Sequence, residues 1–431
     1  HKVAGKSMVR QVASACQRAQ IDELLFVVGH KAEEVKNALG TQFFYALQEP
    51  QLGTGHAVMV ALPILPDDID TVFVLCGDTP LLSEDTLKAM AAQFAEQKAT
   101  CTILTAEMDR PFGYGRILRD PLGRIKGIVE EKDATDEERK ITEINAGVYC
   151  FHTDSLRLAV ADLQNDNAQG EYYLTDVVKW FYEHGKLVNS YLASDTMEIL
   201  GINDRVQLAQ ADAVMRHRKC IQLMKDGVTI VDPNSTYIEM DVQIGQDTII
   251  EPDTYLRGDT VIGSHCHIGP QTDISNCKTG DGCRIFRSVL VDSQLGNACQ
   301  VGPFCYIRPK TVLADRVKAG HFVELKKTQV GEGSKIPHLS YMGDAIIGAG
   351  VNIGCGSITC NYDGMNKFIT QIEDGAFIGC NTNLVAPVVV HKNAYIAAGS
   401  TINKEVPEDA LAIARARQEN KENWQRPQKK Q

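Results

Sequence analysis

Histidine, arginine and lysine side chains cluster in the second half of the chain, in segments that interrupt a regular repeat. His338 stands in PHLSYMGD (337–344), downstream of Arg308 and Lys326. A neutral imidazole can take a proton from an amine, and arginine with lysine forms a clamp for phosphate. Glu324 is expected to orient the imidazole and to favour its charged form. These residue types suit acyl transfer from an activated thioester to the amine of a phosphorylated substrate, with His338 as general base. The alternative is a structural histidine.

Branched aliphatic residues recur every six positions across this half of the chain. They include Ile244, Ile250, Leu256, Ile262, Ile268 and Ile274, then Leu295, Val301, Ile307 and Leu313, and finally Ile378, Leu384, Val390, Ile396 and Ile402. This period is typical of a parallel β-helix with three flat sides and about 18 residues per coil. Glycine and small residues suit its corners, where the backbone is left-handed. The pattern predicts a left-handed parallel β-helix of roughly ten coils over residues 228–431. Coils of this length place Arg308, Lys326 and Tyr341 on one face, and Asn361 is expected beside them.

The first half of the chain alternates strand-like and helix-like segments. Strands are expected at 24–30, 71–78, 101–108 and 146–151, and helices at 31–39 and 83–97. The alternation predicts a Rossmann-like α/β domain over residues 1–204, with a mostly parallel sheet covered on both faces. Residues 204–226 lack glycine and proline, so a linker helix is expected over 205–227.

Polar residues follow the predicted strands of this first domain, where ligands bind in such sheets. Residues 51–56 form a glycine-rich turn that opens a helix, whose backbone N–H groups suit an anion or a base. Asp78 directly follows a strand and suits Mg²⁺ beside phosphates. Further polar clusters occur at 113–116, 130–133 and 143–147. Taken alone, the turn and Asp78 are equally consistent with a helix cap and an Asp turn.

The order and spacing of these motifs, with PHLSYMGD (337–344) and TCNYDG (359–364), resemble one bacterial enzyme family over essentially the whole chain. This is the family of bifunctional N-acetylglucosamine-1-phosphate uridyltransferase / glucosamine-1-phosphate acetyltransferases. The resemblance implies acetylation of glucosamine-1-phosphate by acetyl-CoA. It implies a second, Mg²⁺-dependent transfer of UMP from UTP to N-acetylglucosamine-1-phosphate. It also implies a cytoplasmic homotrimer whose product, UDP-N-acetylglucosamine, feeds peptidoglycan and lipopolysaccharide synthesis.

The resemblance also implies roles for individual residues. In the first domain it implies a UDP-N-acetylglucosamine site, with uracil contacts from Gln48, Gly53 and Thr54 and sugar contacts from Gly115, Glu130 and Asn145. It implies Asp78 and Asn203 as Mg²⁺ ligands, and Asn203 is also expected to line the UDP-N-acetylglucosamine site. In the second it implies His338 as the general base, amino-sugar phosphate binding by Arg308, Lys326, Tyr341, Asn352 and Lys367, and acetyl-CoA contacts from Cys355, Asn361, Tyr362, Cys380, Ala398 and Arg415.

Three departures from the family pattern carry expectations of their own. The chain opens at His1, after the position of the family's glycine-rich triphosphate loop, so full uridyltransferase activity is not expected. Cys76 stands where the family has tyrosine, which alters one nucleotide or sugar contact. Cys380 stands where the family has serine or another small residue.

Composition limits the other function classes. A chain of 431 residues is expected to form two domains. A net charge of -11 argues against a nucleic-acid partner. No apolar run reaches the roughly 18 residues of a membrane span, and thirteen cysteines without regular spacing indicate reduced thiols. Two alternatives remain. One is a nucleotidyltransferase whose β-helix only assembles the oligomer. The other is a metal-dependent β-helix hydratase, for which the sequence supplies one suitable histidine instead of three.

Overall fold

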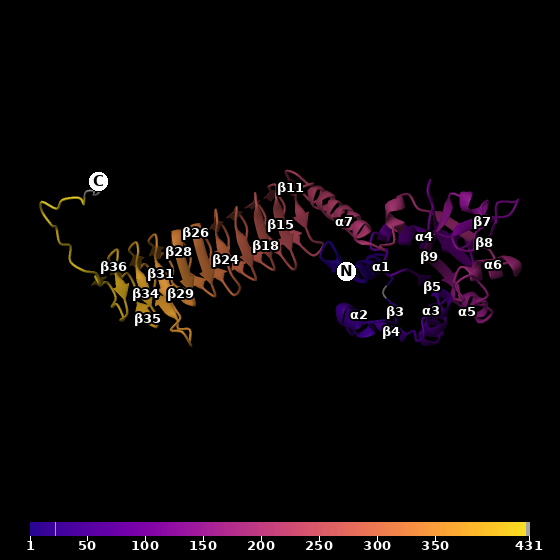
Figure 1. Ribbon diagram of the computed structural model, residues 1–431, viewed down its shortest axis with the longest axis horizontal. Coiled ribbons are helices and arrows are strands. Elements are labelled where there is room, and N and C mark those ends of the chain that lie inside the picture. The colour runs from indigo at the N-terminus through magenta and orange to yellow at the C-terminus, as the bar shows by residue number, and fades with distance from the viewer. Residues whose placement is uncertain (22, 428–431) are drawn as a thin grey trace. The chain divides into compact units, whose positions relative to one another are not determined.

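The computed structural model describes residues 1–21 and 23–427, which divide into two compact units (Figure 1). Unit 1 spans His1–Met215 and unit 2 spans Arg216–Gln431. The boundary falls inside helix α7 (Arg205–Lys225), in the region where a linker helix was expected. No helix among the described residues combines the length and the apolar character needed to cross a membrane.

Unit 1 is an α/β unit built on a six-stranded sheet. Its helices are α1 (Met8–Arg18), α2 (Ala32–Leu39), α3 (Thr54–Ala61), α4 (Glu84–Gln97), α5 (Thr153–Ala161) and α6 (Asp176–Glu183). Its strands are β1 (Lys2–Val3), β2 (Lys6–Ser7), β3 (Leu25–Val28), β4 (Phe44–Leu47), β5 (Thr71–Val74), β6 (Cys101–Glu107), β7 (Arg116–Arg119), β8 (Ile125–Val129), β9 (Glu143–His152) and β10 (Val188–Leu192). The sheet has the order β10-β6-β9-β7-β8, with β5 also paired to β9, while β3 and β4 form a separate parallel pair.

The sheet is mixed, so the expectation of a mostly parallel sheet was wrong. Strand β9 runs antiparallel to β5, β6 and β7, and only β10 is parallel to β6. The reason is local, because β7 and β8 form a hairpin between β6 and β9, where no strand was expected. Alternate residues of β9 still pack into two different hydrophobic cores, as expected for a sheet covered on both faces. Val148 packs with α1 and α4, and Phe151 packs with α5 and α6.

Unit 2 is a parallel β-helix, as the hexapeptide period predicted. Two of its sides belong to one sheet of β11 (Thr229–Ile230), β12 (Tyr237–Ile238), β14 (Ile249–Ile250), β15 (Thr254–Arg257), β17 (His267–Ile268), β18 (Thr272–Ser275), β20 (Arg284–Ile285), β21 (Val289–Val291), β23 (Gln300–Val301), β24 (Tyr306–Ile307), β26 (Lys318–Lys326), β28 (Lys335–Gly343), β30 (Asn352–Ile353), β31 (Ile358–Cys360), β33 (Phe377–Ile378), β34 (Asn383–Val385), β36 (Tyr395–Ile396), β37 (Thr401–Ile402) and β38 (Leu411–Ala412). The third side is the sheet of β13 (Gln243–Ile244), β16 (Val261–Ile262), β19 (Lys278–Thr279), β22 (Gln294–Leu295), β25 (Val312–Leu313), β27 (Gln329–Val330), β29 (Ala345–Ile347), β32 (Thr370–Ile372) and β35 (Val388–Val390).

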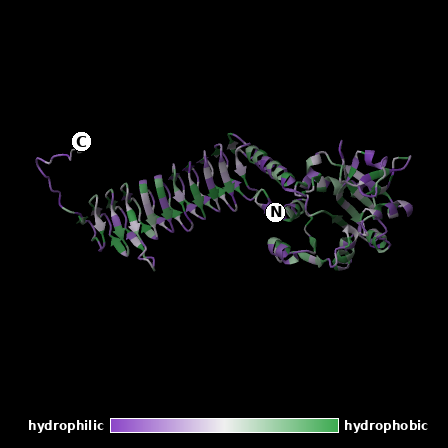
Figure 2. Ribbon diagram, in the orientation of Figure 1, coloured by the Kyte–Doolittle hydropathy of each residue, from purple (hydrophilic) through white to green (hydrophobic). Residues whose placement is uncertain are grey.

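The repeating aliphatic residues point inward and stack from coil to coil. Leu256, Ile274 and Ile307 are fully buried, and Ile262 is 2% exposed. Figure 2 shows the hydrophobic residues recurring on the strands of successive coils. Burying one such side chain stabilises a fold by about 1.5–3 kcal/mol, so the column supplies much of the stability of unit 2. The corners carry non-glycine residues with positive φ, such as His265 at 56°.

A histidine between two carboxylates makes the last coils sensitive to pH. His391 lies 3.1 Å from Glu373 and hydrogen-bonds Glu405 at 2.5 Å. Glu405, followed by Glu373, raises the pKa of His391 above its ordinary value of 6.5. A raised pKa stabilises the fold fully below the ordinary value, and this contribution is lost as pH rises through the raised value.

We therefore expect the midpoint of thermal unfolding of unit 2 to fall as pH is raised from about 6 to about 8. The fall should be larger than in His391→Gln. Circular dichroism melts of both proteins at each pH measure it. An identical pH dependence in the two proteins would contradict the assignment to His391.

Two candidate active sites

His338 lies at one corner of the β-helix, in a row with Cys355, Cys380 and Ala398. The residue after each of them turns the corner with a positive φ; these are Leu339, Gly356, Asn381 and Gly399. Backbone hydrogen bonds of 2.7–2.9 Å join successive turns, from Gly356 to Leu339, from Asn381 to Cys355 and from Gly399 to Cys380. Arg415 extends the row by donating to the carbonyl of Ala398 at 2.7 Å. The structure thus brings the predicted base and four predicted acetyl-CoA residues together.

The imidazole of His338 is exposed beside a second histidine. Strand β28 pairs it with His321 of β26, and the two ring centroids lie 5.6 Å apart. No described residue hydrogen-bonds the His338 ring, so its nitrogens are available to a ligand.

The predicted contact between Glu324 and His338 does not form within the chain. Glu324 stands opposite Tyr341, three residues past the corner, and accepts a hydrogen bond from Arg308 at 2.7 Å. Glu324, which was expected to orient the His338 imidazole, therefore pairs with Arg308 of the preceding coil.

Cationic side chains gather on the flat side next to this corner. Arg308 and Lys326 lie on neighbouring coils, and Lys367 approaches Lys326 closely enough to lower the pKa of Lys326, with burial as the second cause. The Tyr341 side chain lies over Gly343, and a Cβ added at Gly343 would therefore overlap the tyrosine hydroxyl. Three cations and a phenol on one face suit a phosphate group.

Asn352 is the one predicted sugar-phosphate residue that the structure leaves apart from this group. It lies on β30 opposite Phe377 and Lys335, on the other side of the His338 corner. The resemblance alone had implied its role, and the corner at His338 places it on a different side of the prism from Lys326.

The loop after β31 brings Lys367 close to Lys326, and the side of the β-helix that carries Arg308, Lys326 and Lys367 is called the cationic side below. Asp363 accepts the amides of Met365 and Asn366 at 2.8 and 2.6 Å, and Tyr362 pairs with Lys367 as an antiparallel bridge. Asn361 is buried at the base of the loop, whereas Tyr362 is 60% exposed.

Asp344 is a site residue that the sequence reasoning missed. Its buried carboxylate accepts a hydrogen bond from Asn361 at 2.7 Å and lies 3.7 Å from Lys326. The sequence signal that could have identified Asp344 was the Gly343-Asp344 pair at the end of an interrupted hexapeptide, but such a pair also occurs at ordinary corners of a β-helix.

In unit 1 the structure brings the three predicted sugar residues together. A Cβ built on Gly115 would lie 3.5 Å from the Glu130 carboxylate and 3.6 Å from the Cβ of Asn145. Burial raises the pKa of Glu130, and the Thr175 hydroxyl, which donates to it at 3.0 Å, opposes that shift. Asn145 donates to the Tyr149 hydroxyl at 2.7 Å, which fixes its side chain.

Asp78 and Asn203 meet around Gly201. A Cβ at Gly201 would lie 3.8 Å from the Asp78 carboxylate and 4.0 Å from the Asn203 amide nitrogen. Cys76 is close by, and burial raises the pKa of its thiol to about 11. Within the described part of the chain, no three His, Cys, Asp or Glu side chains form a metal-binding group.

The predicted uracil residues form a tightly packed turn. Gln48 donates to the Gly53 carbonyl at 2.9 Å, and the Thr54 hydroxyl accepts from Leu174 at 3.1 Å. A Cβ at Gly53 would lie 2.7 Å from the Tyr172 carbonyl oxygen, so glycine is required there. The Gly55 amide already donates to that carbonyl at 2.7 Å, so it is not free for an anion as the turn had suggested.

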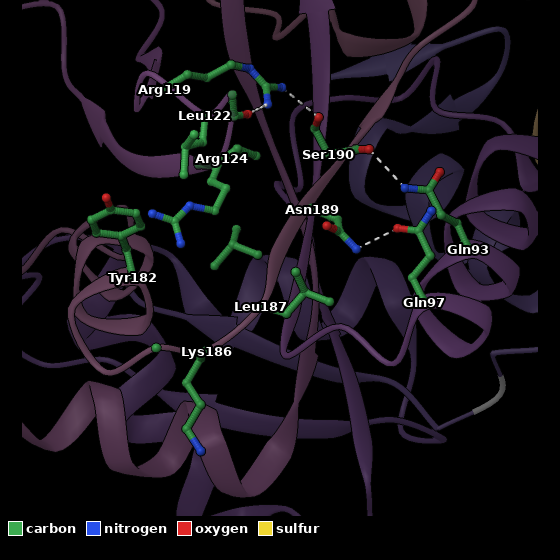
Figure 3. A pocket seen from close by; sticks show the side chains of 14 residues that line it. Gln93, Gln97, Arg119, Leu122, Arg124, Tyr182, Lys186, Leu187, Asn189 and Ser190 are labelled. Carbon is green, nitrogen blue, oxygen red and sulfur yellow. Dashed lines mark hydrogen bonds between the residues drawn. The ribbon is translucent and has the colours of Figure 1, made fainter.

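A separate cavity of about 460 Å³ lies in unit 1 among the β7–β8 hairpin, α6 and β10 (Figure 3). Arg119, Arg124, Tyr182 and Lys186 line it. It contains none of the predicted site residues.

Comparison with known proteins finds family models that match residues in each unit. A model of the nucleotidyl transferase family matches residues 2–204, and one of the bacterial transferase hexapeptide (six repeats) matches residues 241–272 and 369–404. The "Bifunctional protein GlmU" of Geobacillus sp. (strain WCH70) is 53% identical over 98% of this chain and 92% of its own. Proteins of that name from Brevibacillus brevis and Heliobacterium modesticaldum are each 52% identical over 98% of this chain, and 91% and 93% of theirs.

Proposed function

This chain belongs to the family of bifunctional GlmU proteins, and we propose that it acetylates glucosamine-1-phosphate and then transfers UMP from UTP to the acetylated product. The observation that carries the proposal is the corner row in unit 2. His338 shares a corner with Cys355, Cys380 and Ala398, and the cationic side lies next to it. A base between a phosphate clamp and a row for a long cofactor arm is the arrangement that acetyl transfer to an amino-sugar phosphate needs.

Each group has a defined task in acetyl transfer. Arg308, Lys326 and Lys367 hold the phosphate, and Tyr341 and Asn352 contact the sugar. The pantetheine arm of acetyl-CoA runs along the corner row, with Arg415 at its 3′-phosphate and Asn361 and Tyr362 near the thioester. His338 removes a proton from the attacking amine, whose nitrogen bonds to the thioester carbonyl carbon. The C–S bond breaks, and the departing thiolate of coenzyme A takes up the proton. No acyl-enzyme is required, because the thioester is already activated.

The second reaction uses the ends of the strands in unit 1, and the expectation that this chain lacks the full uridyltransferase activity stays a prediction. Gln48, Gly53 and Thr54 form the uracil site, and Gly115, Glu130 and Asn145 hold the acetylated sugar. Asp78 and Asn203 fit Mg²⁺, which binds proteins through few ligands and supplies neutralisation of the phosphate charge.

The protein works as a cytoplasmic homotrimer. Phe304 and Phe322 are stacked at 5.2 Å on the His338 corner with 52% and 60% of their surfaces exposed, and Leu339 continues the row at 60%. An apolar row of this kind supports association of copies along the β-helix. All thirteen cysteines are free thiols, which supports a reducing compartment.

Thiol release from acetyl-CoA tests the acetyl transfer. It should require glucosamine-1-phosphate, and Arg308→Met should raise the KM for this substrate about 10- to 100-fold, because one charged contact to phosphate is lost. Arg316→Met is the control, since Arg316 pairs with Glu332 on the exposed surface. No turnover by the folded protein would favour a β-helix that only assembles the oligomer.

Gly343→Ala tests the position of Tyr341. The added methyl group must displace the tyrosine hydroxyl, and a shift of about 1 Å can cost up to 100-fold in rate. We expect kcat/KM for glucosamine-1-phosphate to fall about 10- to 100-fold. Gly127→Ala is the control, because its Cβ meets only an ordinary contact at 3.7 Å. Equal activity of both variants would remove Tyr341 from the site.

A further inference from the structure

Asp344 is a carboxylate held inside a corner of the β-helix. Its side chain is 4% exposed and its φ is 48°, in the left-handed region. Its amide donates to the Lys326 carbonyl at 3.0 Å, and its carbonyl accepts from Thr370 at 3.2 Å. Burying a charge on a strained backbone is unfavourable unless the charge is paired, so the partners of this carboxylate account for its presence.

Those partners belong to both halves of the acetyltransferase site. Oδ2 accepts from the buried Asn361 amide at 2.7 Å and lies 3.7 Å from Nζ of Lys326. Oδ1 lies 3.4 Å from Lys327, whose side chain is 62% exposed. Oδ2 therefore connects Lys326, which is proposed to bind the phosphate, with Asn361, which is proposed to lie near the thioester. Oδ1 contacts only the surface residue Lys327 among the described ion pairs.

Asp344 is also the buried counter-charge of the cationic side. Lys367 and Arg308 both lower the pKa of Lys326, whereas Asp344 raises it. The other nearby carboxylate, Glu324, is paired with Arg308. Without Asp344, Lys326 and Lys367 would face each other without a buried counter-charge before any phosphate arrives.

We propose that Asp344 is a positioning residue that fixes Lys326 and Asn361 in one geometry, so that the phosphate clamp and the thioester pocket are aligned before substrates bind. The inference rests on the proposed acetyltransferase function and deepens it. Preorganised groups avoid the cost of being ordered during binding and reaction.

Asp344→Asn separates the charge of this side chain from its shape, because the amide oxygen can still accept from Asn361. We expect the KM for glucosamine-1-phosphate to rise about tenfold or more and the KM for acetyl-CoA to stay within about twofold. The alkaline limb of kcat/KM should move to lower pH, since Lys326 loses the group that favours its charged form. Asp344→Ala should raise both KM values. Lys327→Gln is the matched control and should leave both unchanged.

Unchanged KM values and an unchanged alkaline limb in Asp344→Asn, with an active parent, would overturn this inference alone. An inactive parent would overturn the proposed function and this inference with it. If Asp344→Asn fails to fold, a double-mutant cycle of Lys326→Gln and Asn361→Ala replaces it. Coupling through Asp344 predicts non-additive losses in kcat/KM, and additive losses would refute it.

Discussion

Replacing His338 by alanine is expected to lower kcat for acetyl transfer by about 10²- to 10⁴-fold, the usual contribution of a positioned general base. The KM for acetyl-CoA should change little, because the cofactor row keeps its other members. The imidazole is exposed, lies in the row of Cys355 and Cys380, and has no hydrogen-bond partner among the described residues.

Steady-state assays with saturating glucosamine-1-phosphate measure this loss. His321→Ala is the informative comparison, since this ring lies 5.6 Å from His338 on the preceding coil. A full rate in His338→Ala together with a lost rate in His321→Ala would transfer the role of base to His321.

Replacing Arg116 by methionine is expected to destabilise unit 1 by about 3 kcal/mol. Its side chain is 2% exposed, and it pairs with Glu131 at 2.7 Å and donates to the Tyr114 carbonyl. Removing the buried guanidinium leaves Glu131 with only Arg139, at 3.5 Å, as a counter-charge and frees the loop that carries Gly115. Denaturant unfolding of unit 1 measures the change.

Arg119→Met is the matched control for this prediction. Arg119 pairs with Glu143 at 2.8 Å, but its side chain is 37% exposed. Pairs at the surface contribute roughly 0–1 kcal/mol. If both variants lose the same small amount, the Arg116 pair has no special part in the fold.

The hexapeptide period was sufficient to predict the β-helix, because inward residues such as Ile268 and Ile307 repeat without regard to the rest of the chain. It also predicted that Arg308, Lys326 and Tyr341 share a side. Asn352, whose role came from the resemblance alone, lies on another side, because the period counts residues per coil but does not locate the corners.

Contacts formed by long side chains were not predictable in the same way. Glu324 was expected to contact His338 and instead pairs with Arg308. The sequence does not show which of several nearby donors a long carboxylate side chain will reach. Asp344 was missed because its importance comes from a side-chain contact with Asn361 on the next coil, which residue type and spacing do not reveal. In unit 1, alternation of strands and helices predicted the α/β class, whereas the antiparallel course of β9 depends on a hairpin.

The central claim is that one corner row of unit 2 unites the general base with the thioester site. A crystal structure of the protein with coenzyme A and glucosamine-1-phosphate tests it most directly. We expect the pantetheine arm to lie along Cys355, Cys380 and Ala398, the amine to face His338, and the phosphate to bind Arg308, Lys326 and Lys367. Coenzyme A bound elsewhere, or an amine facing away from His338, would contradict it.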